Sequence, residues 1–535
     1  MKKFNFLTAS LVLIAAGGVA TYFYLKNVAI KVSSPLNTAQ VVPGTASMAT
    51  FIQPNQKAIT KLQQFGTPEA RKLISESYAE FQAENLAEND IDWEKDIQPW
   101  LGGVMLAFVP GDERLDTQSL NLLMIVGIKN KFQALKFVTK LKGDDESKVR
   151  ERKYQGVTIR EVTDKDRKKF SIALLGDYLA IAPVAAAVED AIDTFQGKNA
   201  SMGENVVEVL QQSAGVENAI ATVFIPNYAE FVREFADDLS AEKNLSAGGL
   251  QQLEQINSLV MGIGVDDQGV RLRAVTKLVA PLSPELTRVV SGEILQRFPV
   301  ETMMLVSGTG ISQLWSLVMS QAQGNQDLQN ALDTVRNTFS EVGLDVDREV
   351  SWMDGEFAAG LITSSEGILR TTGVGGAMVL ETSDRSAAEV TLKKLNEIAI
   401  KNPGVAVKER QVGSQLVTEW QMLGVGTFFG YGWLDDNALF LALGEPLIEG
   451  MMSVPENGLI GSAGFEEIVG SLPKSNQGYF YLDMEQAMVW AHRYPFVNVL
   501  MSSEVKTILG SIRGIGVTAS WSDELTNEIE MLLAL

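Results

Sequence analysis

The chain contains no cysteine and only one histidine, His492, among its 535 residues. Without cysteine it has no disulfide, no thiolate nucleophile, no iron–sulfur cluster and no cysteine-ligated zinc. A single histidine excludes metal sites built from several imidazoles and leaves one candidate for an imidazole base. We therefore assign no catalytic, cofactor-binding or metal-ligating residue from these residue types.

Positive charge is scarce as well, because 45 lysines and arginines stand against 66 aspartates and glutamates, a net charge of −21. Nucleic acids and anionic lipid surfaces are bound through basic patches, so the sequence predicts no nucleic-acid partner. The hydrophobic fraction of 46% and the charged fraction of 21% are those of a globular protein. The length predicts several domains.

Catalytic motifs are also missing. The glycine-rich segments 308–310 and 373–376 do not complete a dinucleotide-binding pattern, and the chain has neither a P-loop nor a Gly-x-Ser-x-Gly nucleophile elbow. Ser-x-x-Lys occurs at Ser471 and Ser503 without its companion motifs. The acidic clusters 144–146, 237–238 and 435–436 lack the spacing of a calcium loop and indicate solvated turns.

Residues 4–25 form an uncharged run between Lys3 and Lys26. As a helix it would span about 33 Å at about 1.5 Å per residue, enough to cross a bilayer core. We therefore expect a cytoplasmic tail over 1–3 and an uncleaved single-pass transmembrane helix. A cleaved signal peptide is the alternative. The bulk of the chain is then expected on the extracytoplasmic side of an inner (plasma) or thylakoid membrane, in the periplasm or thylakoid lumen.

An internal duplication follows a linker over 26–42. Residues 91–100 resemble 344–352, 177–182 resemble 437–442, and 262–265 resemble 514–517, always in the same order and with offsets between 252 and 260. Such a collinear series predicts two homologous halves, 43–298 and 299–535. Leu286, Val290 and Ile294 lie at helical spacing after Ser283-Pro284, so we expect a helical join over about 284–298.

Each half mixes helical and strand patterns. Leu328, Leu332, Val335 and Phe339 form a helical stripe, whereas residues 157–159 and 170–174 alternate like strands. A helix is predicted over 184–195, strands over 219–225 and 478–482, and a hairpin turn at 266–269. Short connections require antiparallel pairing. The fold class is therefore α+β: a transmembrane helix followed by two tandem halves with antiparallel sheets.

Two groups of aromatic residues are candidates for a structural or a binding role. Trp100 with Gly103 and Trp352 with Gly355 recur at matching places of the two halves. We predict that each Trp fills a corner between a helix and a strand, with an exposed docking ring for a partner as the alternative. The segment 424–433 interleaves glycines with four aromatic residues, Phe428, Phe429, Tyr431 and Trp433. It predicts an aromatic hairpin within a sheet, with a partner-binding surface as the alternative.

Three features point to a known family: the uncharged run, the doubled layout and the segment Asp96-Ile97-Gln98-Pro99-Trp100-Leu101-Gly102-Gly103. In these features the chain resembles a family of membrane-anchored proteins that is common in cyanobacteria. That family is described only as a domain of unknown function. The resemblance implies a bacterial envelope or thylakoid setting and carries over no catalytic residue. We expect a non-enzymatic binding or assembly module, held at the membrane by residues 4–25, for a protein or lipid-linked partner. A membrane-tethered hydrolase using serine or carboxylate chemistry is the alternative.

Overall fold

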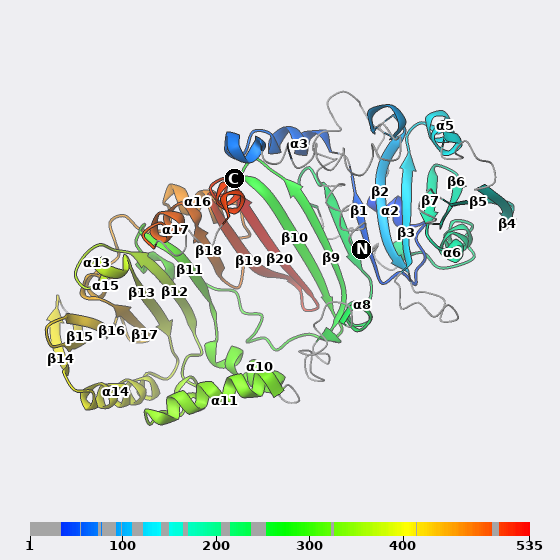
Figure 1. Ribbon diagram of the computed structural model, residues 1–535. Helices are drawn as coiled ribbons and strands as arrows, with labels where there is room; N and C mark the ends of the chain where they lie inside the picture. The colour runs from blue at the N-terminus through cyan, green and yellow to red at the C-terminus, as the bar shows by residue number, and fades with distance from the viewer. Residues whose placement is uncertain are drawn as a thin grey trace, which may run out of the picture. The chain divides into compact units, whose positions relative to one another are not determined.

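A computed structural model of the chain describes thirteen stretches, some of them short. They are residues 34–53, 55–72, 76, 93–97, 99–109, 121–140, 149–163, 169–204, 215–236, 253–322, 326–413, 415–494 and 502–535. This part of the chain divides into two compact units, of which the first contains strands β1–β10 and the second contains strands β11–β20 (Figure 1). Each unit is considered by itself below.

The first unit consists of ten strands with helices between them. In chain order its elements are α2 (Pro35–Ala39), β1 (Met48–Ile52), α3 (Gln56–Leu62), a π-helical turn (Trp93–Ile97), β2 (Leu101–Val109), β3 (Asn121–Ile128), α5 (Lys131–Lys140), β4 (Val149–Tyr154), β5 (Val157–Thr163), β6 (Lys169–Leu175), β7 (Tyr178–Ala182), α6 (Ala185–Phe195), β8 (Ala221–Ile225), α8 (Tyr228–Ala236), β9 (Ile256–Val265) and β10 (Gly269–Leu278).

The second unit begins with a 3₁₀ helix and also has ten strands. Its elements are η4 (Glu293–Arg297), β11 (Thr302–Thr309), α10 (Ile311–Ala322), α11 (Gln326–Glu341), α12 (Val346–Glu349), β12 (Glu356–Thr363), α13 (Leu369–Thr372), β13 (Val374–Glu381), α14 (Arg385–Lys401), β14 (Val405–Val412), β15 (Gln415–Met422), β16 (Gly426–Trp433), β17 (Ala438–Leu443), α15 (Glu445–Met451), α16 (Ala463–Val469), β18 (Tyr479–Asp483), α17 (Met484–Ala491), α19 (Ser503–Leu509), β19 (Gly514–Asp523) and β20 (Thr526–Ala534).

The strands follow the same order in both units, and neighbouring strands pair antiparallel. The first unit runs β10-β9-β8-β1-β2-β3-β7-β6-β5-β4. The second unit runs β20-β19-β18-β11-β12-β13-β17-β16-β15-β14. Strand β1 therefore occupies the place of β11, β2 that of β12, and so on through β10 and β20. This common order agrees with a duplication, while the bounds 43–298 and 299–535 stay a prediction.

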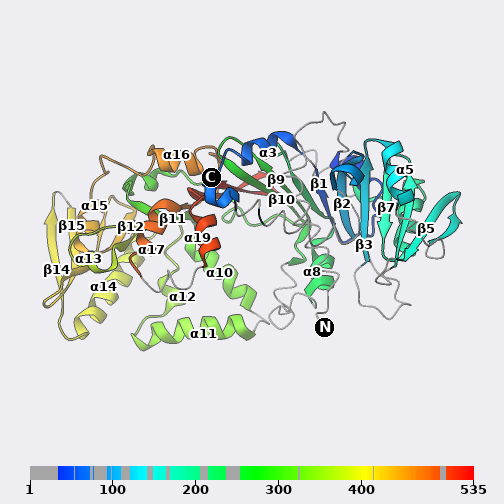
Figure 2. The same ribbon diagram turned by 45° about the horizontal axis from the view of Figure 1, so that its top comes forward.

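The sheet of the second unit buries apolar side chains on both faces, because successive residues of a strand point to opposite sides. Leu305, Ala358 and Val379 pack on one face with apolar side chains of α13, α15 and α16. Trp352, Leu380 and Leu439 pack on the other face with side chains of α14 and the first residue of α10. Figure 2 labels the helices α14 and α10 of this unit. The second cluster covers only part of its face, and this leaves room for the groove described below.

The transmembrane helix in the expected fold class has to be corrected. Residues 4–25 lie outside the described residues, and within that described part no helix is long and apolar enough to cross a membrane. The longest helix there, α14, has 17 residues and carries charged side chains, whereas a span requires about 20 apolar residues. We therefore describe the fold as two units with antiparallel sheets and helices. The single-pass topology and the inner or thylakoid membrane location depended on that helix and are no longer held.

The helical join expected over 284–298 is also wrong, because only Glu293–Arg297 is helical and it forms a 3₁₀ helix. The backbone N–H of Val290 donates to the carbonyl of Asn476 at 2.9 Å, and that of Gly292 donates to the carboxylate of Glu356 at 3.2 Å. Gly292 itself adopts a left-handed conformation with φ of +72°. Contacts with distant residues therefore take the N–H groups that a continuous helix would need.

A groove on the sheet of the second unit

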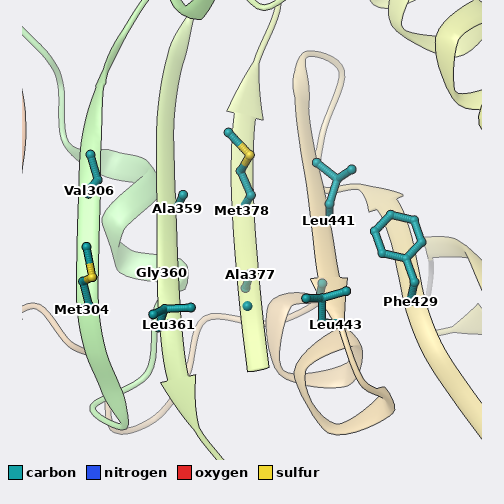
Figure 3. Close-up of a pocket in the computed structure, with 12 residues that line it drawn as sticks. Met304, Val306, Ala359, Gly360, Leu361, Ala377, Met378, Phe429, Leu441 and Leu443 are labelled. Carbon is teal, nitrogen blue, oxygen red and sulfur yellow. The ribbon is translucent and has the colours of Figure 1, made fainter. Parts of the chain in front are cut away.

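The candidate site is an apolar groove of about 470 Å³ that crosses neighbouring strands of the second unit. It lies on the sheet face that α14 covers only in part, and Figure 3 shows the lining side chains side by side on their strands. The lining residues share an absence of charged and polar side chains. They are Met304, Val306, Ala359, Gly360, Leu361, Gly376, Ala377, Met378, Phe429, Leu441, Ala442 and Leu443.

The strand register explains why apolar side chains gather there. Residues that face each other across an antiparallel pair lie on the same side of the sheet. Val306 faces Ala359, which in turn faces Met378, and Met378 faces Leu441. Each belongs to a different strand, so the row runs across β11, β12, β13 and β17. The alternation that buries Leu305 and Val379 on the other face thus places this row on the groove face.

Several of these side chains remain accessible to a ligand. Val306 is 37% exposed, Leu361 is 41% exposed and Leu443 is 48% exposed. Met304, Met378 and Phe429 are half-buried. Apolar side chains exposed as a contiguous patch are unusual in a folded protein and mark binding surfaces.

The first unit fills the corresponding place with larger side chains. Leu106 faces Thr50 and Met124 there, just as Ala359 faces Val306 and Met378 in the second unit. Two residues further along β2 and β12, Phe108 faces Leu122 and Leu361 faces Gly376, so Leu122 corresponds to Gly376. Leu106 and Leu122 are buried. The groove therefore exists because alanine and glycine stand in the second unit where the first unit has two leucines.

Gly376 is not required by the backbone. A Cβ atom at this position would lie 3.5 Å from Leu443 Cδ1, which is ordinary van der Waals contact, and its φ is not in the left-handed region. In contrast, a Cβ at Gly355 would lie 2.6 Å from the carbonyl oxygen of Glu381. Gly355 is thus a packing requirement, whereas the main effect of Gly376 is to leave space.

The aromatic residues of 424–433 lie on β16, an interior strand of the second unit between β15 and β17. Phe429 lines the groove, whereas Tyr431 is buried and its hydroxyl accepts a hydrogen bond from Asn396 on α14 at 2.7 Å. Arg385 stacks over the Trp433 ring at 4.2 Å, and Phe428 contacts Trp420. The structure therefore places only Phe429 of the four in the groove. A role for the other three in partner binding stays a prediction.

The two tryptophans singled out in the sequence are buried just before corresponding strands. Trp100 precedes β2 and its indole N–H donates to the carbonyl of Asp96 at 2.7 Å. Trp352 precedes β12 and donates to the hydroxyl of Thr391 at 3.1 Å. Gly355 follows Trp352 at the close contact with Glu381 described above, and Gly103 lies within β2. These tryptophans pack inside their units and do not line the groove.

The ionisable side chains that the fold buries in the second unit lie outside the groove lining. Burial alone raises the pKa of the Glu349 carboxyl, but hydrogen bonds donated by Lys394 and Thr391 outweigh burial and hold that pKa below its ordinary value. Burial, with the nearby Glu356 carboxylate, raises the pKa of Glu381. Neither carboxyl lines the groove, so its walls offer no proton donor or acceptor from a side chain.

The residues considered for catalysis are scattered. His492 caps the C-terminus of α17, is exposed, and its Nδ1 lies 2.6 Å from the carbonyl oxygen of Met488. Ser503 begins α19. Asp435 accepts hydrogen bonds from the backbone of Asn437 and Ala438, which makes it a turn residue as expected. The acidic clusters 144–146 and 237–238 lie outside the described residues. Within the described part no three acidic or histidine side chains are grouped so as to hold a metal ion.

Comparison with known proteins adds a family to this geometry. The model of a family described as "Protein of unknown function (DUF3352)" matches residues 6–535. The chain belongs to this family. The match confirms the resemblance to a domain of unknown function. No curated protein matches the chain significantly.

Two solved structures show a distant likeness to this DUF3352 protein. Crystal form III of TP0453 is 12% identical with a TM-score of 0.26, covering 47% of this chain and 83% of that one. Crystal form I of TP0453 is 11% identical with a TM-score of 0.26, covering 47% and 82%. Likenesses at this level carry no argument about fold or function.

Sequence patterns alone do not locate the groove, although the chain carries a signal for it. The segments 302–306 and 438–443 are apolar at almost every position, so each strand had to bury or expose apolar side chains on both faces. The strand register also sets Ala359 and Gly376 against Leu106 and Leu122. That difference in side-chain size, read within a strand register, was the available evidence for a cavity.

Proposed function

We propose that this DUF3352 protein is a non-enzymatic binding module and that the groove of the second unit is its ligand site. The observation that carries the proposal is the substitution of Ala359 and Gly376 for the two buried leucines of the first unit. It removes two large side chains from a packed face and leaves the neighbouring Leu361 and Leu443 exposed. A ligand that restores this packing recovers the apolar contact that the first unit makes internally.

The chemistry of the groove restricts what it binds. Apolar surface covered by a ligand contributes roughly 25 cal/mol for each Å² removed from water, whereas a polar group placed there would lose its hydrogen bonds to water. The volume of about 470 Å³ lies within the range of ligand pockets. The ligand is therefore an apolar group or an apolar face of a larger molecule.

Binding is favoured over the hydrolase alternative by what lines the site. Hydrolysis by serine or carboxylate chemistry needs a nucleophile or base beside the substrate and donors for the developing negative charge. The groove walls supply aliphatic side chains, methionine thioethers and one phenyl ring. Such a surface holds a ligand without activating water.

A neutral apolar dye tests this proposal. The full chain is titrated with Nile red, whose fluorescence rises in an apolar site, and compared with the double variant Ala359→Leu and Gly376→Leu, called the filled variant. We expect the filled variant to fold, since the first unit carries leucine at both places, and to weaken dye binding by about tenfold. A control variant, Ala331→Leu with Ala406→Leu, adds two leucines at exposed positions of α11 and β14.

The control should bind the dye like the unmodified chain. Equal dye binding by the filled variant, with an unchanged far-UV circular dichroism spectrum, would show that the groove is not the site and would overturn the proposal.

A further inference from the structure

We infer that the ligand of this groove is the apolar face of a basic amphipathic helix on a partner protein. The inference rests on the proposed function, since it assumes that the groove is a ligand site. Three observations on the described residues carry it: the way in which the first unit covers its own sheet face, the helix that follows β18 in the second unit, and the distribution of charge along the chain.

In the first unit an amphipathic helix packs an aromatic side chain against the corresponding face. Helix α8 follows β8 directly, and its Phe231 packs against a cluster of buried side chains that includes Leu106, Phe108 and Leu122. These are the side chains whose register positions correspond to the groove. The fold thus already uses a helix with an aromatic anchor to close this kind of surface.

In the second unit the equivalent helix lacks the anchor. Helix α17 follows β18, which occupies the place of β8, and both helices begin with a side-chain cap: Asn227 accepts from the N–H of Glu230, and Asp483 accepts from that of Gln486. The fourth residue after the cap is Phe231 in one helix and Ala487 in the other. The position of α17 that corresponds to Phe231 therefore carries a methyl group in place of a phenyl ring.

The absent anchor and the two small residues act together. Leucine side chains at 359 and 376 would fill the groove from the strands, and a phenyl ring at 487 would correspond to the anchor that α8 carries in the first unit. All three positions carry alanine or glycine in the second unit. A helix supplied by another protein, with a large apolar residue facing the sheet, completes the packing that the first unit obtains from Phe231, which is the helix-in-groove mode of recognition.

Charge selects among the possible occupants. Residues 279–535 carry 32 acidic and 15 basic side chains, a net charge of −17, while residues 1–278 carry a net charge of −4. The acidic charge is therefore concentrated in the part of the chain that contains the groove. Long-range attraction favours a cationic partner and disfavours anionic amphiphiles and a second, equally acidic copy of this region. A helix with lysine or arginine on its polar face fits both the apolar groove and the net negative charge of residues 279–535.

The test uses defined probes on the full chain. One is a synthetic amphipathic peptide of leucine and lysine with a single phenylalanine on its apolar face, and the second has glutamate in place of every lysine. Binding is measured by fluorescence anisotropy and by displacement of Nile red, and helix formation by circular dichroism. The filled variant, Ala359→Leu with Gly376→Leu, has the same charge as the unmodified chain, so it separates the groove from general electrostatic attraction.

We expect the lysine peptide to become helical on binding, to displace the dye, and to lose about tenfold or more in affinity for the filled variant. The glutamate peptide should bind far more weakly, and added salt should weaken the lysine peptide by screening. Equal binding of the lysine peptide to the unmodified chain and the filled variant would mean that charge alone attracts it, and would overturn the inference.

The remaining outcomes separate this inference from the proposed function. If the filled variant loses the dye but neither peptide displaces it from the unmodified chain, the groove binds apolar ligands and the helix inference fails. Displacement of the dye by the uncharged detergent octyl glucoside, and not by the peptide, would assign the groove to acyl chains. Concentration-dependent self-association that the filled variant abolishes would assign it to a second copy. If the filled variant binds both the dye and the lysine peptide as tightly as the unmodified chain does, both proposals are wrong.

Discussion

The substitution Glu349→Gln tests the electrostatic network that holds α14 on the sheet of the second unit. Glu349 is 6% exposed at the end of α12 and accepts hydrogen bonds from Thr391 and Lys394 of α14. Thr391 in turn accepts the indole N–H of Trp352 at 3.1 Å. The carboxylate therefore joins α12, α14 and the buried tryptophan, and its charge is required only for the bond with Lys394.

The expected magnitude follows from which bonds survive. Glutamine keeps an acceptor oxygen for Thr391 but removes the charge-assisted bond with Lys394. Bonds to charged groups contribute about 1.5–3 kcal/mol, and the Lys394 side chain, 33% exposed, can return to water after the change. We expect the free energy of unfolding to fall by about 2 kcal/mol at neutral pH.

The pH dependence gives a sharper result. Because the pKa of Glu349 is lower in the folded chain than in the unfolded chain, its contribution is complete above the unfolded value, about 4.3, and is lost as the pH falls through the folded value. The difference between the unmodified chain and Glu349→Gln should therefore be constant from about pH 6 to pH 8 and shrink steadily below about pH 4.

Denaturant titrations followed by far-UV circular dichroism across this pH range measure the difference. The control is Glu389→Gln, which makes the same chemical change in an exposed pair with Arg385 on α14 and should cost less than about 1 kcal/mol. A Glu349→Gln difference that stays the same at low pH, or that matches Glu389→Gln at neutral pH, would refute the reasoning.

Three further substitutions address packing and the histidine. Gly355→Ala should lower the free energy of unfolding by about 1–3 kcal/mol, since its Cβ would meet the carbonyl of Glu381. Gly376→Ala should change the free energy of unfolding by no more than about 0.5 kcal/mol. Equal shifts in the melting temperatures of the two variants would contradict the packing argument. His492→Ala should leave both stability and Nile red binding unchanged, because the ring is exposed outside the groove; a properly folded variant that loses the activity of the chain in cells would instead favour catalysis.

Local patterns were sufficient for several elements. Asp266 lies in the predicted turn between β9 and β10 and accepts bonds from the N–H groups of Gln268 and Gly269, which is what its short polar side chain suits it for. The helix predicted over 184–195 is α6, and the strands predicted over 219–225 and 478–482 are β8 and β18 within a few residues. These elements depend on residues close together in the chain, so the sequence contains the information directly.

The stripe on α11 shows where local information stops. The spacing of Leu332, Val335 and Phe339 predicts a helix, and the helix forms. Leu332 is buried, yet Val335 is 37% exposed and Phe339 is 39% exposed. Periodicity determines that the backbone can be helical, but the side that becomes covered depends on which elements pack against it.

By itself the sequence determined the alternation of helices and strands, the antiparallel pairing and the shortage of catalytic groups, because each follows from the nature of the residues or from their near neighbours. The groove was decided only by the tertiary structure. Its walls come from strands between Met304 and Leu443, and their register places Ala359 and Gly376 on one face of the sheet beside exposed leucines. A cavity is a relation between side-chain sizes on neighbouring strands, and that relation exists only once the strands are paired.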